Sequence, residues 1–376
     1  MNAIIKGILT LPVAAALAGC CNSNVGTQPA QEKATEYVTE KAYDVPAFEK
    51  GYEHGVSAMY TATTDDALYI AGGCNFPDVP AAEGGNKVYY KGIYRIATDV
   101  EGKWEMIGEL PEASAYGVSV QHAGRWIIAG GMNSEGASDK VYSIDLATMQ
   151  IDTLPSLPCS VDNAAGTIAG NTLYIAGGNG KAGNRMFALD MQNGTQWNEL
   201  PKMPSLPRVQ PVLAAAADNS IYLWGGFSPA TEGHEAIVHT DGMKYDITAG
   251  EWQPIGDVTA DGESITLSGG TAIAINDSTI IATGGVDKDI FLDAISGRYE
   301  LVAKSDYMYK PAGWYRFNSR LMQYSTANGE WSVLSEDSRH ARAGALLVKQ
   351  KNRLYLVCGE LKPGIRSTEI SRISIR

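Results

Sequence analysis

Short hydrophobic runs that end in paired glycines recur along the whole chain. The first is Leu68–Ala71, which is followed by Gly72 and Gly73. Residues of this kind favour a strand buried on both faces, and paired glycines permit backbone angles and close approaches that a Cβ would forbid. Close copies of the run begin at Trp126, Leu173, Ile221, Ile280 and, in degenerate form, Leu354. Six copies predict six structural units.

A period of roughly 50 residues, with short β-rich runs between turn residues, is typical of kelch repeats. The sequence therefore predicts an all-β fold, a six-bladed kelch-type β-propeller with four strands in each blade. Aromatic rings that recur downstream of each run should pack one blade against the next. Those expected in third strands are Tyr94, Tyr142, Phe187, Tyr245 and Tyr324, and those opening fourth strands are Trp104, Trp197, Trp252 and Trp331, with Ile151 in the second unit.

The last unit lacks one strand. It offers strand candidates at 344–349, 354–358 and 368–375, and the chain then stops. A segment at 41–45 precedes the first complete unit and has no other partner. We expect this N-terminal segment to be the outer strand of the last blade, because closing the ring removes the remaining exposed sheet edges.

The first residues have the pattern of an export signal. Lys6 gives a positive start, an apolar stretch follows, and Leu17-Ala18-Gly19-Cys20 ends it like the lipobox of bacterial lipoproteins. An ordinary signal peptide cleaved near Ala18 is the alternative. We expect a signal peptide over 1–20 with Cys20 lipidated, a flexible tether over 21–41, and a propeller over 42–376. The protein should be exported, periplasmic or anchored to the outer membrane, and should touch the membrane only through this lipid.

Composition limits the partners. The chain has 42 acidic and 30 basic residues and a net charge of -12, which argues against a nucleic-acid surface. The remaining cysteines are scattered, and their spacing shows no disulfide framework and no zinc site. The histidines form no metal-ligand cluster, so we expect no metal and no cofactor. These residues are Cys21, Cys74, Cys159, Cys358, His54, His122, His234, His239 and His340.

A G-x-G-x-x-G pattern at Gly178–Gly183 is half of a dinucleotide-binding fingerprint. The residues after it, 185–190, alternate like a strand and open no helix, so there is no helix N-terminus for a pyrophosphate. The pattern indicates a tight loop between two strands.

Propeller geometry places the loops after each paired glycine on the same face as the loops between blades. The most unusual of these loops is Gly359–Arg366, in which Pro363-Gly364 favours a type II turn that would bring Glu360 and Arg366 face to face. A carboxylate and a guanidinium at a channel mouth suit acid–base work on an anionic substrate. A surface hairpin with a solvated charge pair is the plainer interpretation.

Resemblance favours the first interpretation. The loop Gly-Glu-x-Lys-Pro-Gly-x-Arg at 359–366 resembles the signature loop of the bacterial N-acetylneuraminate epimerases, which are six-bladed kelch propellers. The segments 115–119, 207–210, 284–286 and 290–291 resemble the same family. The unit with the Glu-Arg loop is last here rather than internal, so the chain looks like a cyclically permuted branch.

The resemblance implies roles for particular residues. It makes Glu360 the proton acceptor and Arg366 its catalytic partner. Substrate-binding residues are expected among the loops of the same face, and Glu360, Arg366, Arg208 and Tyr116 should line one cavity. The residues expected to bind substrate are Arg208, Gln210, Tyr116, Arg342 and Asn318.

Two features depart from the regular repeat. In the sixth unit Cys358-Gly359 stands for the paired glycines, and we expect the backbone to differ slightly there. An insertion over 287–320 is dense in aromatic residues, which fits either a lid over the pocket or an ornament outside blade five.

The resemblance therefore implies a sialic acid mutarotase, which interconverts the α and β anomers of N-acetylneuraminate, a small anionic sugar. A non-catalytic kelch lipoprotein that binds a glycan or a protein on the same face is the rival hypothesis, since fold alone supports both. A sialidase is less favoured because its Ser-x-Asp-x-Gly-x-Thr-Trp turns are absent, and a kelch-type copper oxidase lacks its histidine ligands.

Overall fold

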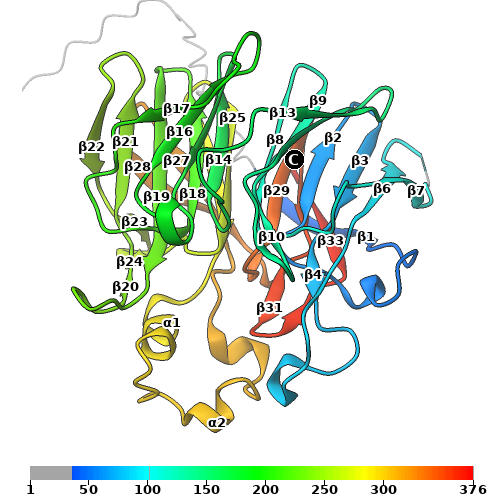
Figure 1. Ribbon diagram of the computed structural model, residues 1–376. Helices are drawn as coiled ribbons and strands as arrows, with labels where there is room; N and C mark the ends of the chain where they lie inside the picture. Colours follow the sequence, from blue (N-terminus) through cyan, green and yellow to red (C-terminus); the bar gives the residue numbers. More distant parts are fainter. Residues whose placement is uncertain (1–35, 101, 376) are drawn as a thin grey trace, which may run out of the picture. The chain divides into compact units, whose positions relative to one another are not determined.

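Six antiparallel sheets radiate from a central channel in the computed structural model, which describes residues 36–100 and 102–375 (Figure 1). Each of the first five blades is built from consecutive strands, ordered from the channel outward. Blade one has β2 (Tyr60–Thr63), β3 (Ala67–Ala71), β6 (Gly92–Ala97) and β7 (Glu105–Glu109); blade two has β8 (Val118–His122), β9 (Arg125–Ala129), β12 (Val141–Asp145) and β13 (Ile151–Leu154). Blade three has β14 (Ala165–Ala169), β15 (Thr172–Ala176), β16 (Met186–Asp190) and β17 (Asn198–Leu200).

The remaining blades follow the same order, with small additions. Blade four has β18 (Val209–Ala216), β19 (Ser220–Ser228), β21 (Gly242–Asp246) and β22 (Glu251–Ile255), with β20 (Ile237–Val238) paired to β19. Blade five has β25 (Gly270–Asn276), β26 (Thr279–Gly284), β27 (Arg320–Ser325) and β28 (Glu330–Glu336). Two-stranded hairpins extend some loops: β4 (Cys74–Asn75) with β5 (Val88–Tyr89), β10 (Met132–Asn133) with β11 (Gly136–Ala137), and β23 (Val258–Ala260) with β24 (Glu263–Ile265). The prediction of an all-β propeller with six blades is confirmed.

The N-terminal strand closes the ring as expected. Blade six consists of β29 (Leu346–Gln350), β30 (Arg353–Val357) and β33 (Glu369–Ile375), with β1 (Tyr37–Asp44) as its outer strand. The register pairs Tyr37 with Ile375 and Lys41 with Ser371. The strand begins earlier than the sequence suggested, so the tether boundary placed at Lys41 falls inside blade six. The expected signal peptide, Cys20 and most of the expected tether lie outside the described residues.

Hydrophobic clusters fill the spaces between neighbouring blades. One joins Ile127 and Val141 of blade two to Leu173 and Phe187 of blade three, and the other blade pairs are joined in the same way. Indole groups add hydrogen bonds across these junctions: Trp197 donates to the carbonyl of Pro155 at 2.8 Å. The recurring aromatic rings therefore pack neighbouring blades against each other, as predicted.

The paired glycines also join adjacent blades. In five units the N–H of the second residue donates to a carbonyl at the entry of the next blade, for example Gly73 to Ser114 at 2.9 Å. A Cβ on Gly72 would lie 2.5 Å from that same carbonyl, so the position favours glycine. Cys358 nevertheless adopts φ 50° and Gly359 φ 97°, close to 59° and 93° at the first pair. The expectation of a different backbone there is wrong: the conformation is kept, and the buried cysteine carries its strain.

A closed ring of six backbone hydrogen bonds surrounds the channel mouth. Each blade contributes one residue in the left-handed conformation, with φ between 53° and 70°. The N–H of each residue donates to the carbonyl of its counterpart in the preceding blade, at 2.7 to 3.1 Å. We call these residues the hexad: Ala58, Tyr116, Asn163, Gln210, Gly269 and Gly344. The hexad fixes where the first strand of every blade starts. It therefore forms the base of the surface at the channel mouth.

The insertion of blade five carries the helical part of the fold. It contains α1 (Lys288–Ile295), α2 (Lys304–Tyr307) and a 3-10 turn over Ala312–Tyr315. The carboxylate of Asp287 caps α1 by accepting from the N–H groups of Asp289 and Ile290. Figure 1 shows α1 and α2 at the same end of the propeller as β31 (Glu360–Lys362), the first strand of the Glu-Arg loop.

Candidate functional site

The Glu-Arg loop is a two-stranded hairpin. β31 pairs with β32 (Ile365–Arg366), and Glu360 stands directly opposite Arg366 in the register. Gly364 occupies the turn with φ 83°, the left-handed angle that a type II turn requires at its third residue. The prediction from Pro363-Gly364 that these two side chains face one another is confirmed.

One of the two carboxylate oxygens of Glu360 is fixed by neighbouring groups. Its Oε1 lies 2.7 Å from Nη1 of Arg366 and accepts from the N–H of Gly364 at 3.1 Å. Within the described residues, Oε2 accepts no hydrogen bond. The side chain is 27% exposed, so the second oxygen remains accessible to a proton from a bound molecule.

Arg366 is enclosed beneath this carboxylate. Its side chain is 3% exposed, its Nε donates to the hydroxyl of Ser57 at 3.1 Å, and its guanidinium lies over the ring of Phe76, 5.0 Å from the centroid. Burial by itself lowers the pKa of Arg366, but the Glu360 carboxylate, with Cys74 and Tyr116, outweighs burial and raises it. Arg366 therefore stays charged and orients Glu360.

A cavity of about 190 Å³ lies beside the hairpin, at the channel mouth. Its lining combines hexad residues, which form the floor, with residues of the loops after the paired glycines. Tyr116, Gln210 and Gly344 belong to the hexad, and Glu360 comes from the hairpin. Five of the remaining lining residues are aromatic: Phe227, Phe291, Tyr307, Tyr315 and Phe317. Polar groups on the floor and aromatic rings at the side suit a small polar ring with apolar C–H faces.

The insertion supplies much of this wall, so the interpretation as a lid or wall fits better than an external ornament. Lys362, on the same hairpin as Glu360, donates to the carbonyls of Met308 at 3.1 Å and Lys310 at 2.7 Å. The hydroxyl of Tyr309 donates to the carbonyl of Ala82 in the blade-one loop. These contacts anchor the insertion over the cavity.

Gln210 and Tyr116 are oriented by neighbours. The Gln210 amide donates to the side-chain oxygen of Asn163 at 2.9 Å, which couples two hexad residues. The hydroxyl of Tyr116 accepts from Nζ of Lys87 at 2.9 Å. Burial raises the pKa of Tyr116 well above its usual value, with Cys74 and Glu360 adding to the effect and Arg366 opposing it.

Three residues expected to bind substrate do not line this cavity. Arg208 is fully buried, and its guanidinium is paired with Asp241 at 2.6 Å and donates to the carbonyls of Gly225 and Asp241. Arg342 repeats this arrangement in blade six, where it donates to the carbonyls of Cys358 and Glu369.

Both arginines thus hold the first residue of a glycine pair to the start of a third strand. Asn318 is buried too, and donates to the carbonyl of Gly284 at 3.3 Å. Arg208 is therefore not placed to bind substrate as expected, because its hydrogen-bonding groups are committed to the blade. Arg366 is placed behind Glu360 rather than in the lining.

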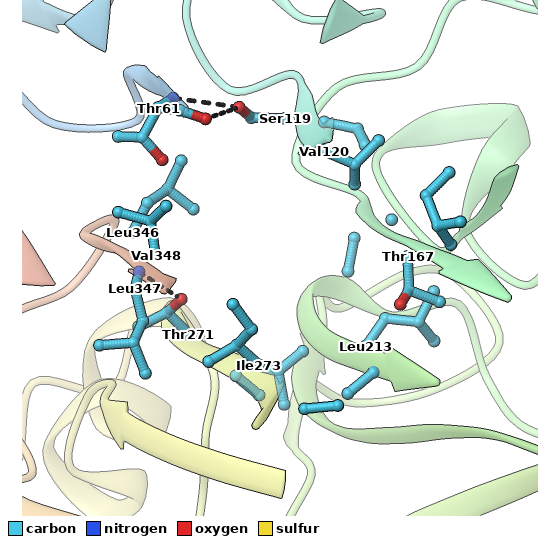
Figure 2. A pocket seen from close by; sticks show the side chains of 18 of the residues that line it. Thr61, Ser119, Val120, Thr167, Leu213, Thr271, Ile273, Leu346, Leu347 and Val348 are labelled. Carbon is cyan, nitrogen blue, oxygen red and sulfur yellow. Dashed lines mark hydrogen bonds between the residues drawn. The ribbon is translucent and has the colours of Figure 1, made fainter. Parts of the chain in front are cut away.

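A second cavity, the central channel of about 320 Å³, runs below the hexad between the six inner strands. Figure 2 shows its lining, in which Ser119 bonds the backbone of Thr61 and Thr271 bonds that of Leu347. These hydroxyl groups provide hydrogen-bond partners for backbone N–H and C=O groups of the inner strand in the neighbouring blade. Glu360 and Tyr116 do not line the channel; both line the cavity at its mouth.

Some residues at the channel mouth were not predicted from the sequence. Ser57, Phe76 and Lys87 contact the Glu-Arg pair or Tyr116 from the first blade's loops. Only the position of Phe76 and Lys87 in the loop after a glycine pair could have indicated them. Across 36–100 and 102–375, no three potential metal-ligating side chains gather, and no helix is long and apolar enough to cross a membrane.

Comparison with known proteins identifies similar chains. The family model described as N-acetylneuraminate epimerase matches residues 16–152 and 154–376. N-acetylneuraminate epimerase 1 of Escherichia coli O6:H1 is 28% identical over 60% of this chain and 61% of its own. The N-acetylneuraminate epimerase of Haemophilus influenzae is 28% identical over 58% of each chain. The match thus spans less than two thirds of these relatives' length.

A solved structure described as that of YjhT aligns with a TM-score of 0.60 and 16% identity. The alignment covers 86% of this chain and 97% of that one. At this identity the likeness concerns the fold.

Proposed function

The chain belongs to the N-acetylneuraminate epimerase family, and on that premise we propose that it interconverts the α and β anomers of N-acetylneuraminate. In this reaction a base takes the proton of the anomeric hydroxyl, the sugar ring opens to a ketone, and the ring closes on the other face. The required groups are a positioned proton acceptor and a site that orients a small sugar.

One observation carries the proposal: the Glu360 carboxylate lines the cavity with Oε1 held by Arg366 and Gly364 and with Oε2 open. Such a carboxylate is oriented and still able to accept a proton. Arg366 also places a buried positive charge beside the cavity, which offsets the net charge of -12 near an anionic sugar. Gln210 offers its amide to the sugar's hydroxyl or N-acetyl groups, and the aromatic wall packs against its C–H faces.

The test is an anomer assay. A sialidase releases the α anomer, and proton NMR follows its decay to the β anomer with and without the purified protein. Decay several orders of magnitude faster than the spontaneous rate is expected at micromolar protein. Saturable binding of the sugar with no acceleration would support the non-catalytic glycan binder instead, and neither effect would exclude this substrate.

We also propose export and lipidation at Cys20, from the lipobox-like residues 17–20. Labelled fatty acid should enter the wild-type protein in its bacterial host, and Cys20→Ser should abolish the label. A labelled Cys20→Ser protein would overturn the lipid anchor.

A further inference from the structure

The proposed reaction needs a second proton besides the one that Glu360 takes. When the bond between the anomeric carbon and the ring oxygen breaks, its electron pair goes to the ring oxygen, which must be protonated at once or revert. A positioned acid at the cavity would supply this proton. The side chains available are those that line the cavity: Asp287, Tyr116, Tyr307 and Tyr315 carry the candidate protons.

Most of these groups are committed elsewhere. Asp287 caps α1 and pairs with Arg316 at 3.1 Å. The hydroxyl of Tyr315 donates to the carbonyl of Tyr307. Tyr307 lies among the rings of Tyr299, Trp314 and Tyr315, and among the described residues no cation contacts its hydroxyl. A phenolate formed at Tyr307 would therefore lack a counter-charge.

Tyr116 differs because a cation contacts its oxygen. Nζ of Lys87 donates to the Tyr116 hydroxyl at 2.9 Å and lies 4.8 Å from the ring centroid. Since Lys87 fills an acceptor position of that oxygen, the hydroxyl keeps its own proton to donate, and the Cys74 side chain is the other group within hydrogen-bonding reach. In the described part of the chain Lys87 has no carboxylate partner, so its charge is available to the phenolate that proton transfer would leave.

The backbone fixes Tyr116 for this task. Tyr116 is a hexad residue with φ 62°, and its N–H and carbonyl both belong to the ring of hydrogen bonds. Tyr116 thus lines the cavity from the floor, while Glu360 lines it from the hairpin. Two groups on separate rigid elements can face the two oxygens attached to one anomeric carbon.

We propose that Tyr116 is the general acid of ring opening and that Lys87 is a positioning residue that stabilises its phenolate. The inference rests on the proposed function. Glu360 takes the anomeric proton as the carbonyl forms, and Tyr116 gives its proton to the departing ring oxygen. After rotation of the open chain, that hydroxyl attacks the other face and returns its proton to Tyr116, while Glu360 protonates the carbonyl oxygen. Both side chains end as they began.

The experiment is Tyr116→Phe in the anomer assay. The change keeps the ring and removes the acid, so kcat should fall by about two to three orders of magnitude while KM changes less than about threefold. Small acids in the buffer, such as imidazolium, should then raise the residual rate in proportion to their concentration, and should not raise the wild-type rate. Tyr142→Phe, on the outer part of blade two, is the matched control.

The role of Lys87 is tested separately, by the kcat and KM of its variants. Lys87→Met should lower kcat by about tenfold or more with little change in KM, and Lys87→Arg should restore part of the loss. A rise in KM with unchanged kcat in either the Tyr116 or the Lys87 variant would mean that the pair binds substrate, and would overturn the acid assignment. Acid rescue of Tyr307→Phe without rescue of Tyr116→Phe would do the same.

These outcomes are separable from failure of the proposed function. A wild-type protein that leaves the spontaneous rate unchanged contradicts the function itself. An active wild type with a fully active Tyr116→Phe contradicts only the role of Tyr116. Unfolding curves of each variant confirm that the protein compared is folded.

Discussion

The N–H of Ala58 donates to the carbonyl of Gly344 at 2.8 Å, across 286 positions of the chain. This bond joins blade one to blade six and completes the hexad, of which Tyr116, Gln210 and Gly344 line the candidate site. Closure of the propeller therefore also completes the floor of the site. Blade six, on one side of this junction, has β1 as its outer strand.

The first prediction concerns that strand. A chain that begins at Val45 lacks β1 and leaves β33 as an exposed edge, so it should unfold roughly 10 °C or more below a chain that begins at Glu36, and should aggregate. Thermal unfolding and light scattering measure both effects. Equal midpoints for the two chains would show that β1 does not hold the ring closed.

Glu360→Gln should lower the catalysed rate by about two to four orders of magnitude with little change in binding. Glutamine keeps the shape and an acceptor for the N–H of Gly364, and loses the base. The anomer assay measures the rate, and Glu109→Gln, half-exposed on β7, serves as control. A fully active Glu360→Gln would remove this residue as the base.

Arg208→Met should destabilise the protein by about 1–3 kcal/mol, because it leaves the carbonyls of Gly225 and Asp241 without their donor and removes the partner of the half-exposed Asp241 carboxylate. Urea unfolding tests this, and the KM of the protein that remains folded should stay close to wild type. Arg125→Met, which removes a partly exposed partner of Asp145 and Asp152, should cost less than about 1 kcal/mol. A stable Arg208→Met with a much raised KM would restore Arg208 to the binding site.

Lys362→Met should loosen the insertion, since two charge-assisted hydrogen bonds to its backbone are lost. Chymotrypsin should then cut near Tyr307 and Tyr309 faster, and KM should rise about tenfold as the wall closes less often. Lys288→Met, half-exposed at the start of α1, is the control. Unchanged cleavage and KM would mean that Lys362 does not anchor the insertion.

Stability should depend on pH through His340. The residue is fully buried, and its ring nitrogens bond the Thr39 hydroxyl and the Ser319 carbonyl. Burial lowers the pKa of His340 below the usual 6.5; Asp337 and the bond to Ser319 oppose this, and Arg342 and Arg339 add to it. The unfolded chain therefore takes up the proton first as pH falls, so stability is full above about 6.5 and is lost as pH falls toward the folded pKa.

The measurement is the unfolding midpoint between pH 8 and pH 5. His340→Gln should reduce the fall of the unfolding midpoint over this pH range by roughly a few degrees. His234→Gln, in an exposed loop, should leave the fall unchanged. An identical decline in wild type and His340→Gln would contradict the linkage.

The sequence alone determined the repeated architecture and the hairpin. Hydrophobic runs such as Leu68–Ala71 and the paired glycines predicted the blades, and Pro363-Gly364 predicted that Glu360 faces Arg366. These features are encoded by residues close in the chain, because strand alternation and turn geometry are local.

Only the tertiary structure decided which polar side chains reach the cavity. Arg208 and Gln210 are two residues apart and would share one face of a regular strand, but Gln210 has φ 54°, which breaks the alternation. Gln210 therefore lines the cavity while Arg208 turns into the blade to meet Asp241. Lys87 reaches Tyr116 from another blade, and Lys362 reaches Met308 from another loop. Such contacts depend on how blades pack, and no local pattern in the sequence specifies them.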